Sequence, residues 1–270
     1  MPAMSTEHVL DDRRDGRRPH GHARVRVLAN KVPEVTVYFW VIKVLTTGMG
    51  ETASDFLARL LGPVPAVALG ALALVASLVL QFAVRRYVPW IYWTAVVMVS
   101  VFGTMAADVL HVGLGVPYAV STPGFLIALA AVFGLWFAVE RTLSIHSVRS
   151  RRREAFYWAA VLATFALGTA AGDLTATAGF GYLGSVVLFA VAICVPALAH
   201  RAGTLGAVTA FWTAYVITRP LGASIADWMA LPGARGGLGL GLGPVTLSWT
   251  VAILGFVGYL AVSRADARPR

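Results

Sequence analysis

The stretch YWTAVVMVSVFGTMAAD, residues 92–108, decides the fold of this chain because its pattern occurs four times. An aromatic residue and a tryptophan are followed by nine residues, a glycine, four residues and an aspartate. The other copies occupy 39–55, 157–173 and 211–227, with every spacing kept. The signature residues are the tryptophans Trp40, Trp93, Trp158 and Trp212, the glycines Gly50, Gly103, Gly168 and Gly222, and the aspartates Asp55, Asp108, Asp173 and Asp227. Such recurrence predicts four copies of one structural unit.

The composition is typical of a membrane protein. The chain is 58% hydrophobic and 13% charged, whereas a soluble domain carries about 25% charged residues. The single cysteine, Cys194, lies in an apolar stretch, which excludes an intrachain disulfide and a cysteine-based metal site. Sequence motifs of metalloproteases, serine hydrolases and phosphate-binding loops are absent, so we expect no enzyme activity and no cofactor.

Eight segments are long and apolar enough to be transmembrane helices, which need about 20 such residues. They are 36–57, 64–84, 88–110, 122–139, 155–176, 180–199, 204–229 and 244–263. The expected fold class is therefore an all-α polytopic membrane protein of about eight transmembrane helices. Each repeat supplies two helices, so all four repeats enter the membrane in the same direction and are parallel. Within a membrane domain at 32–264, the repeats occupy about 32–84, 85–140, 150–200 and 203–264.

The basic residues predict the orientation. With the N-terminus inside, 18 Lys and Arg fall on the cytoplasmic side and only Arg59 and Arg235 fall on the other side. Residues 1–31 hold seven of the 18 and lack an apolar core, so they predict a disordered basic cytoplasmic tail rather than a secretory signal. Residues 265–270 form a second cytoplasmic tail. The expected partners are the lipid bilayer and a small ion or solute, with no nucleic acid.

The repeated stretches also resemble a known family. They are NKVPEVTVYFWVIKVLTTGMGETASDFL at 30–57, RRYVPWIYWTAVVMVSVFGTMAADVL at 85–110, RREAFYWAAVLATFALGTAAGDL at 152–174 and AFWTAYVITRPLGASIAD at 210–227. They resemble bacterial proteins with four tandem copies of the domain-of-unknown-function 347 repeat, often labelled uncharacterised membrane-anchored proteins. The resemblance covers about residues 30–264. It implies two transmembrane helices per repeat and a multi-pass protein of the bacterial inner (cytoplasmic) membrane, and it implies no activity.

The signature tryptophans and glycines each allow two interpretations. The tryptophans favour an aromatic belt at the cytoplasmic interface, and a lining or gating role is the alternative. The glycines favour close contact between helices, because small residues surround them. The alternative is a local break that frees carbonyl groups for an ion, for which Gly48 and Pro220 are the supporting residues.

The aspartates carry the functional hypothesis. An aspartate at the centre of a transmembrane helix costs about 2.5–3.5 kcal/mol, and the C-terminal end of a helix disfavours an acid further. Four such residues favour an intramembrane acidic site that binds a cation or protons. The alternative is that they are solvated helix ends beyond the hydrocarbon.

Further polar residues lie on the same helices as the aspartates. Glu51 and Asp55 are four residues apart on one helical face and repel unless a cation or proton lies between them. Asp108 and His111 are three apart and could share a metal or proton. A metal site would draw on Glu51, Asp55 and Asp108. The even-numbered segments contain almost nothing ionisable and predict a scaffold.

Two basic residues, Lys43 and Arg219, fall inside predicted spans. Against the five carboxylates they leave three net negative charges, which suits hard cations or protons. We expect Lys43 and Arg219 to be intramembrane counter-ions or gating residues, and binding of an anionic substrate is the alternative. The leading hypothesis is an integral membrane transporter for a cation, divalent metals included, or for protons. The alternatives are a cation-selective pore with a four-aspartate ring and a non-transporting scaffold.

Overall fold

The computed structural model describes residues 30–266, and within that range the chain is all-α with no strand. Its α-helices are α1 (Val37–Leu61), α2 (Pro63–Ala83), α3 (Pro89–Asp108), α4 (Tyr118–Glu140), α5 (Arg151–Thr175), α6 (Gly181–Arg201), α7 (Ala207–Ala230) and α8 (Leu242–Ser263). Short π-helical turns follow α3 at Val109–Gly113 and α5 at Ala176–Phe180. No helix boundary differs from its predicted span by more than four residues, so the all-α prediction is confirmed.

Several helices are suited to a membrane. In the described range, five stretches are long and apolar enough to cross one: Pro63–Ala83, Pro89–His111, Tyr118–Glu140, Arg151–Arg201 and Leu242–Ser263. The fourth of these runs through both α5 and α6. Helices α1 and α7 are not among them, and these two carry Lys43 and Arg219. That all eight helices cross the membrane stays a prediction.

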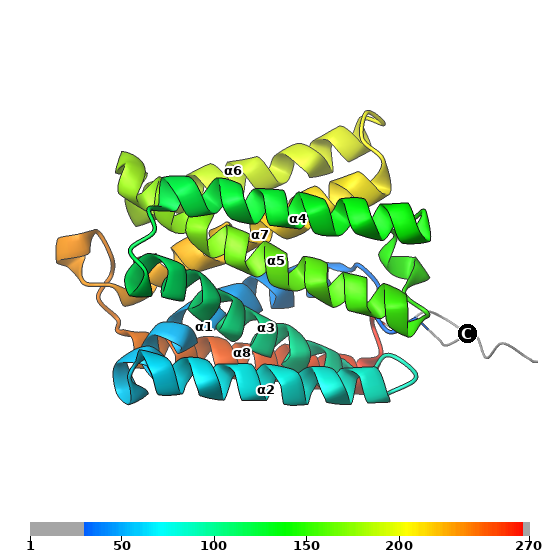
Figure 1. Ribbon diagram of the computed structural model, residues 1–270, viewed down its shortest axis with the longest axis horizontal. Helices are drawn as coiled ribbons and strands as arrows, with labels where there is room; N and C mark the ends of the chain where they lie inside the picture. Colours follow the sequence, from blue (N-terminus) through cyan, green and yellow to red (C-terminus); the bar gives the residue numbers. More distant parts are fainter. Residues whose placement is uncertain (1–29, 267–270) are drawn as a thin grey trace, which may run out of the picture.

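The helices form an inner ring and an outer layer. In the side view of Figure 1, α4 and α6 lie above the inner helices and α2 and α8 lie below them. Helices α1, α3, α5 and α7 each pack against the next, and α7 packs against α1, which closes the ring. Each outer helix packs mainly on the inner helix of the following repeat: α2 on α3, α4 on α5, α6 on α7 and α8 on α1. The outer helix of each repeat therefore covers the inner helix of the next repeat, and the outer helix of the fourth repeat covers the inner helix of the first.

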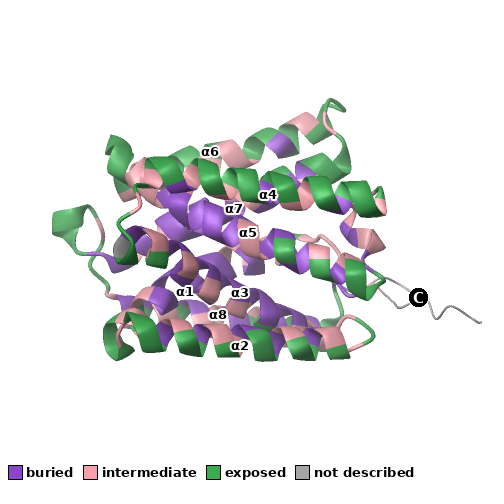
Figure 2. Cartoon of the chain, in the orientation of Figure 1, coloured by how far each residue is buried: buried purple, intermediate pink, exposed green. Residues whose placement is uncertain are grey.

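Burial follows the same division (Figure 2). The inner helices are largely buried, whereas the outer helices expose large apolar side chains such as Leu72, Val191 and Val251. Contiguous exposed apolar surface is expected where a protein contacts lipid. The links from α2 to α3, α4 to α5 and α6 to α7 lie at the end of the bundle where the described chain begins and stops (Figure 1). We call this the termini end and the opposite one the far end; all four inner helices run from the first to the second, as parallel repeats require.

Two residues assigned to tails belong to the folded bundle. Lys31 is buried, and its Nζ lies 2.6 Å from a carboxylate oxygen of Glu154, also buried. Asp266 is buried and accepts a hydrogen bond from the Tyr87 hydroxyl, and burial raises the pKa of the Asp266 carboxyl above its ordinary value. Both tail boundaries are thus wrong at their inner edge, because each residue finds a buried polar partner. Residues 1–29 and 267–270 of the predicted tails lie outside the described residues.

Candidate functional site

The four signature aspartates and Glu51 line one cavity of about 560 Å³. The aspartates lie where the four inner helices approach the far end of the bundle. Glu51 and Asp227 are buried, at 5% and 8% exposure, and the other three acids are half-buried or better. These five residues are therefore not solvated helix ends that project into bulk water. We call this space the acidic cavity.

Two arginines also line the acidic cavity, and sequence reasoning assigned both to external links. Arg59 lies in the last turn of α1, and Arg235 lies in the link between α7 and α8. Arg59 was detectable, because it continues the four-residue spacing of Glu51 and Asp55. With these two cations the five lining carboxylates retain a formal charge of −3. Tyr118 and Tyr182 add hydroxyl groups to the wall.

Arg219 lies behind the acidic cavity and contacts Glu51, which lines it. Its guanidinium is buried and donates to a Glu51 carboxylate oxygen at 2.8 Å and to the Thr169 hydroxyl at 2.7 Å. It also donates to the Thr104 hydroxyl, and to the Thr47 carbonyl at 3.1 Å. These partners come from α1, α3 and α5. Arg219 is therefore a counter-ion of Glu51, as the sequence predicts.

The repeat register explains why these groups meet. Glu51, Thr104 and Thr169 each stand four residues before a signature aspartate, and Arg219 stands eight before the last one. Four residues of helix advance about 6 Å and return to nearly the same face. Three parallel helices thus present oxygen atoms at one depth, and the fourth helix inserts a guanidinium against them.

Lys43 lies deeper and does not pair with a carboxylate. It is fully buried, and its Nζ has no hydrogen-bond partner within the part of the chain that the structure describes. The Nζ lies 4.1 Å from the ring centroid of Phe165 and 4.3 Å from that of Tyr215. The counter-ion prediction is therefore wrong for Lys43, because aromatic faces rather than an acid surround the amine.

The signature glycines allow close contact between inner helices. A β-carbon added to each glycine would overlap a residue of the next repeat, namely the residue eight positions before that repeat's signature aspartate. The glycine of the fourth repeat would overlap the corresponding residue of the first repeat. The pairs are Gly50 with Ser100, Gly103 with Phe165, Gly168 with Arg219 and Gly222 with Thr47. The nearest atoms would lie only 1.8–2.7 Å from the added β-carbon, which no real β-carbon tolerates. The close-contact prediction is confirmed, and α1, α3, α5 and α7 run unbroken through these positions.

The aromatic–tryptophan pairs form a second closed ring near the termini end. Each signature aromatic contacts the tryptophan of the next repeat. The pairs are Phe39 with Trp93, Tyr92 with Trp158, Tyr157 with Trp212 and Phe211 with Trp40, at centroid separations of 5.7, 5.7, 6.1 and 5.7 Å. We call this the aromatic ring. An interfacial belt is therefore wrong for Trp93, Trp158 and Trp212, which are buried inside the bundle.

The comparisons with known proteins agree with the repeat. One family model, described as Repeat of Unknown Function (DUF347), matches residues 38–87, 91–142, 156–202 and 210–266. The chain belongs to the DUF347 family. Every match begins one residue before the signature aromatic and extends through the following outer helix. No curated protein and no solved structure matches the chain.

Two metal-site predictions for this DUF347 chain are not supported. His111 turns away from the cavity, because its π-helical turn directs the ring towards the start of α4. Its Nδ1 lies 3.0 Å from the Val116 carbonyl oxygen, and its Nε2 lies 3.3 Å from the Ser121 hydroxyl. Across residues 30–266, no three His, Cys, Asp or Glu side chains lie close enough to hold one metal ion. Glu51, Asp55 and Asp108 thus share a cavity without forming a compact ligand set.

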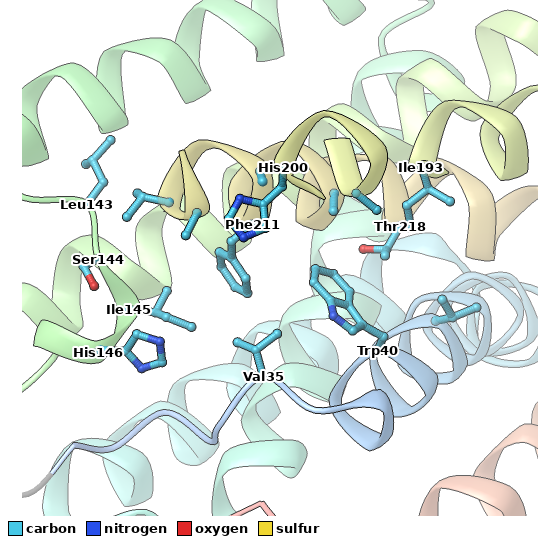
Figure 3. A pocket seen from close by; sticks show the side chains of 16 residues that line it. Val35, Trp40, Leu143, Ser144, Ile145, His146, Ile193, His200, Phe211 and Thr218 are labelled. Carbon is cyan, nitrogen blue, oxygen red and sulfur yellow. The ribbon is translucent and has the colours of Figure 1, made fainter. Parts of the chain in front are cut away.

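A second cavity, of about 570 Å³, lies at the termini end between α1, α6 and α7 (Figure 3). Trp40 and Phe211 of the aromatic ring line it, together with Val35 and mostly apolar side chains. Among the described residues, the ionisable ones that line it are His146 and His200. Because none of these described lining residues is a carboxylate, this cavity is unsuited to cations. The acidic cavity is therefore the candidate site of this DUF347 chain.

Proposed function

We propose that this DUF347 chain is an integral membrane transporter that binds a cation in the acidic cavity. The main observation that supports this proposal is that five carboxylates from four different helices line one cavity. Buried carboxylates without partners are expensive in a membrane, and a bound cation or proton offsets that cost. A scaffold would need no such cavity.

The size of the acidic cavity bears on the solute. A volume of about 560 Å³ lies within the range of about 300–1,000 Å³ that small-molecule pockets occupy. The described acids offer no compact ligand set for a bare metal ion. These two facts support a hydrated cation or a small organic cation as the solute, with proton movement as the alternative.

The pore alternative is weaker. A four-aspartate ring would need a continuous path along the bundle axis. Beneath the acids lie the Arg219 guanidinium, then the Lys43 amine, then the buried aromatic ring. The Arg219 charge, the Lys43 side chain and a layer of aromatic side chains oppose a permanently open cation path. Closure on one side of a binding cavity supports a transporter.

The distribution of basic residues supports an orientation. In the described part of the chain, the termini end carries Arg85, Arg86, Arg141, Arg149, Arg151, Arg152, Arg153, Arg201 and Arg264. The far end carries Arg59 and Arg235. The positive-inside rule then puts the termini end in the cytoplasm of a bacterial inner membrane, with the acidic cavity opening outwards.

Flux in liposomes tests the proposal. We expect uptake of at least one of H⁺, Na⁺, Mg²⁺, Mn²⁺ or methylammonium by the purified chain. Asp227→Asn and Asp108→Asn should each reduce that flux at least tenfold, because each removes a charge from the shared cavity. Glu140→Gln is the matched control, because Glu140 pairs with Arg152 and Arg153 at the termini end and should leave the flux unchanged. Unchanged flux in all four Asp→Asn variants would refute a shared acidic site.

A further inference from the structure

The guanidinium of Arg219 already occupies a cation-shaped cradle beneath the acidic cavity. Its hydrogen bonds reach a carboxylate, two hydroxyl groups and a carbonyl, contributed by three different helices. The cradle consists of Glu51, Thr104, Thr169 and the Thr47 carbonyl. Every group that faces the guanidinium through these bonds is an oxygen acceptor. This donor–acceptor match is what recognition of a planar, multiply donating cation requires.

The groups of the cradle are also hydrogen-bonded to one another. The Thr169 hydroxyl donates to the Thr104 hydroxyl at 3.5 Å, and Thr104 donates to Glu51 at 3.3 Å. These bonds orient the lone pairs of three equivalent repeat positions towards one point. The fourth equivalent position is Ala223, which offers no acceptor. The fourth repeat supplies the cation in place of a fourth ligand.

The cradle is also continuous with the acidic cavity. Glu51 both lines that cavity and holds Arg219, so a cation that descends past the aspartates meets the same carboxylate. Below the cradle, the Arg219 Nε and the buried Ser100 hydroxyl have no hydrogen-bond partner among the described residues. The guanidinium is therefore held through its two terminal nitrogens, and its Nε adds no hydrogen bond to this attachment.

We propose that this cradle is an inner cation-binding site and that Arg219 is its tethered occupant, which a solute cation displaces. The inference rests on the proposed function and names the solute class: a cation with several N–H donors, such as guanidinium or a primary ammonium. A tethered occupant competes at a high effective concentration, so removing it should strengthen binding of a free cation.

Arg219→Ala vacates the cradle and allows a direct test with guanidinium chloride at millimolar concentration. We expect the thermal midpoint of the detergent-solubilised full-length variant to rise saturably, with a half-saturating concentration at least tenfold below that of the wild type. Tetramethylammonium, which has no N–H donor, should give no such rise. Arg201→Ala is the matched control, because Arg201 is exposed in the last turn of α6 and its removal leaves both the acidic cavity and the cradle unchanged. Equal responses of Arg219→Ala and the wild type would overturn the proposal.

A second measurement decides the matter if Arg219→Ala does not fold. Wild-type liposomes should take up radiolabelled guanidinium saturably, and Thr104→Val with Thr169→Val should slow this uptake at least tenfold because two acceptors are lost. No guanidinium uptake, or equal uptake by the double variant, would overturn the proposal. If metal or proton flux still depended on the aspartates in that case, the proposed function would stand while the inner site failed.

Discussion

Gly168 is the signature glycine that faces Arg219. A β-carbon at this position would lie 2.2 Å from the Arg219 Cγ and 2.5 Å from its Cβ. The clash involves the stem of the side chain close to its own backbone, which cannot swing away as a flexible tip can. The glycine therefore sets the depth to which α7 approaches α5, and through it the distance between Arg219 and Glu51.

We expect Gly168→Ala to destabilise the protein by about 1–3 kcal/mol, the usual cost of overpacking a filled interior. Gly134→Ala on α4 is the matched control, because no atom lies within 4 Å of its new β-carbon. That change should be neutral or stabilise by up to about 1 kcal/mol through helix propensity. Thermal unfolding of both variants in one detergent compares them. A Gly168→Ala protein as stable as Gly134→Ala would contradict the packing argument.

At the scale of the elements, the aromatic ring locks the four inner helices together near their beginnings. Three of its tryptophans, Trp93, Trp158 and Trp212, are buried inside the bundle, and Trp40 lines the second cavity. Trp212 also donates from its indole nitrogen to the Leu143 carbonyl at 2.9 Å, which ties α7 to the link between α4 and α5. The ring therefore connects inner helices with each other and with the outer layer.

We expect Trp158→Ala to cost about 3–5 kcal/mol, the range for truncation of a buried tryptophan. Trp90→Ala is the control: Trp90 is 43% exposed at the start of α3 and contributes no signature contact. Its removal should cost clearly less. Thermal unfolding and elution as a single species in size-exclusion chromatography are the measurements. Equal effects of the two substitutions would contradict the packing role of Trp158 and would favour a position in an interfacial aromatic belt.

The sequence predicted the elements well and their neighbours poorly. Apolar length and repeat spacing located every helix, because those properties belong to each segment alone. Spacing also put Glu51 and Asp55 on one face. It did not reveal that Trp158 faces Tyr92 or that Lys43 faces Phe165, because rotation about the helix axis leaves the neighbouring helix undefined. The prediction that His111 shares a metal or proton with Asp108 is wrong, because three-residue spacing puts two side chains on one face only in an α-helix. His111 lies in a π-helical turn instead.

At the scale of the whole molecule, the two ends of the bundle differ in charge and in depth. The far end opens into the acidic cavity, whereas the termini end is closed by the aromatic ring and surrounded by arginines. This polarity matters for function only if the protein has one orientation in the membrane. Orientation is therefore the whole-molecule property to measure.

Single-cysteine reporters in a Cys194→Ser chain test the orientation. We expect Leu238→Cys, in the exposed link between α7 and α8, to react in intact cells with a membrane-impermeant thiol reagent. Thr204→Cys, exposed in the link between α6 and α7, should react only after the cells are permeabilised. The reverse pattern would turn the acidic cavity towards the cytoplasm, and labelling of both sites in intact cells would indicate mixed insertion.

The packing of each outer helix on the next repeat has one more consequence. The ring has no structurally first member: α8 contacts α1 as α2 contacts α3, and the Glu34 amide donates to the Asp266 carbonyl at 3.0 Å. The two ends of the described chain thus meet at a seam that resembles the links elsewhere around the ring. A circular permutant, joined at this seam and opened in the link between α6 and α7, would present the same bundle. The order of the repeats along the chain therefore matters only because it places Glu51 in the first repeat and Arg219 in the fourth. The other repeats carry different residues at these two positions.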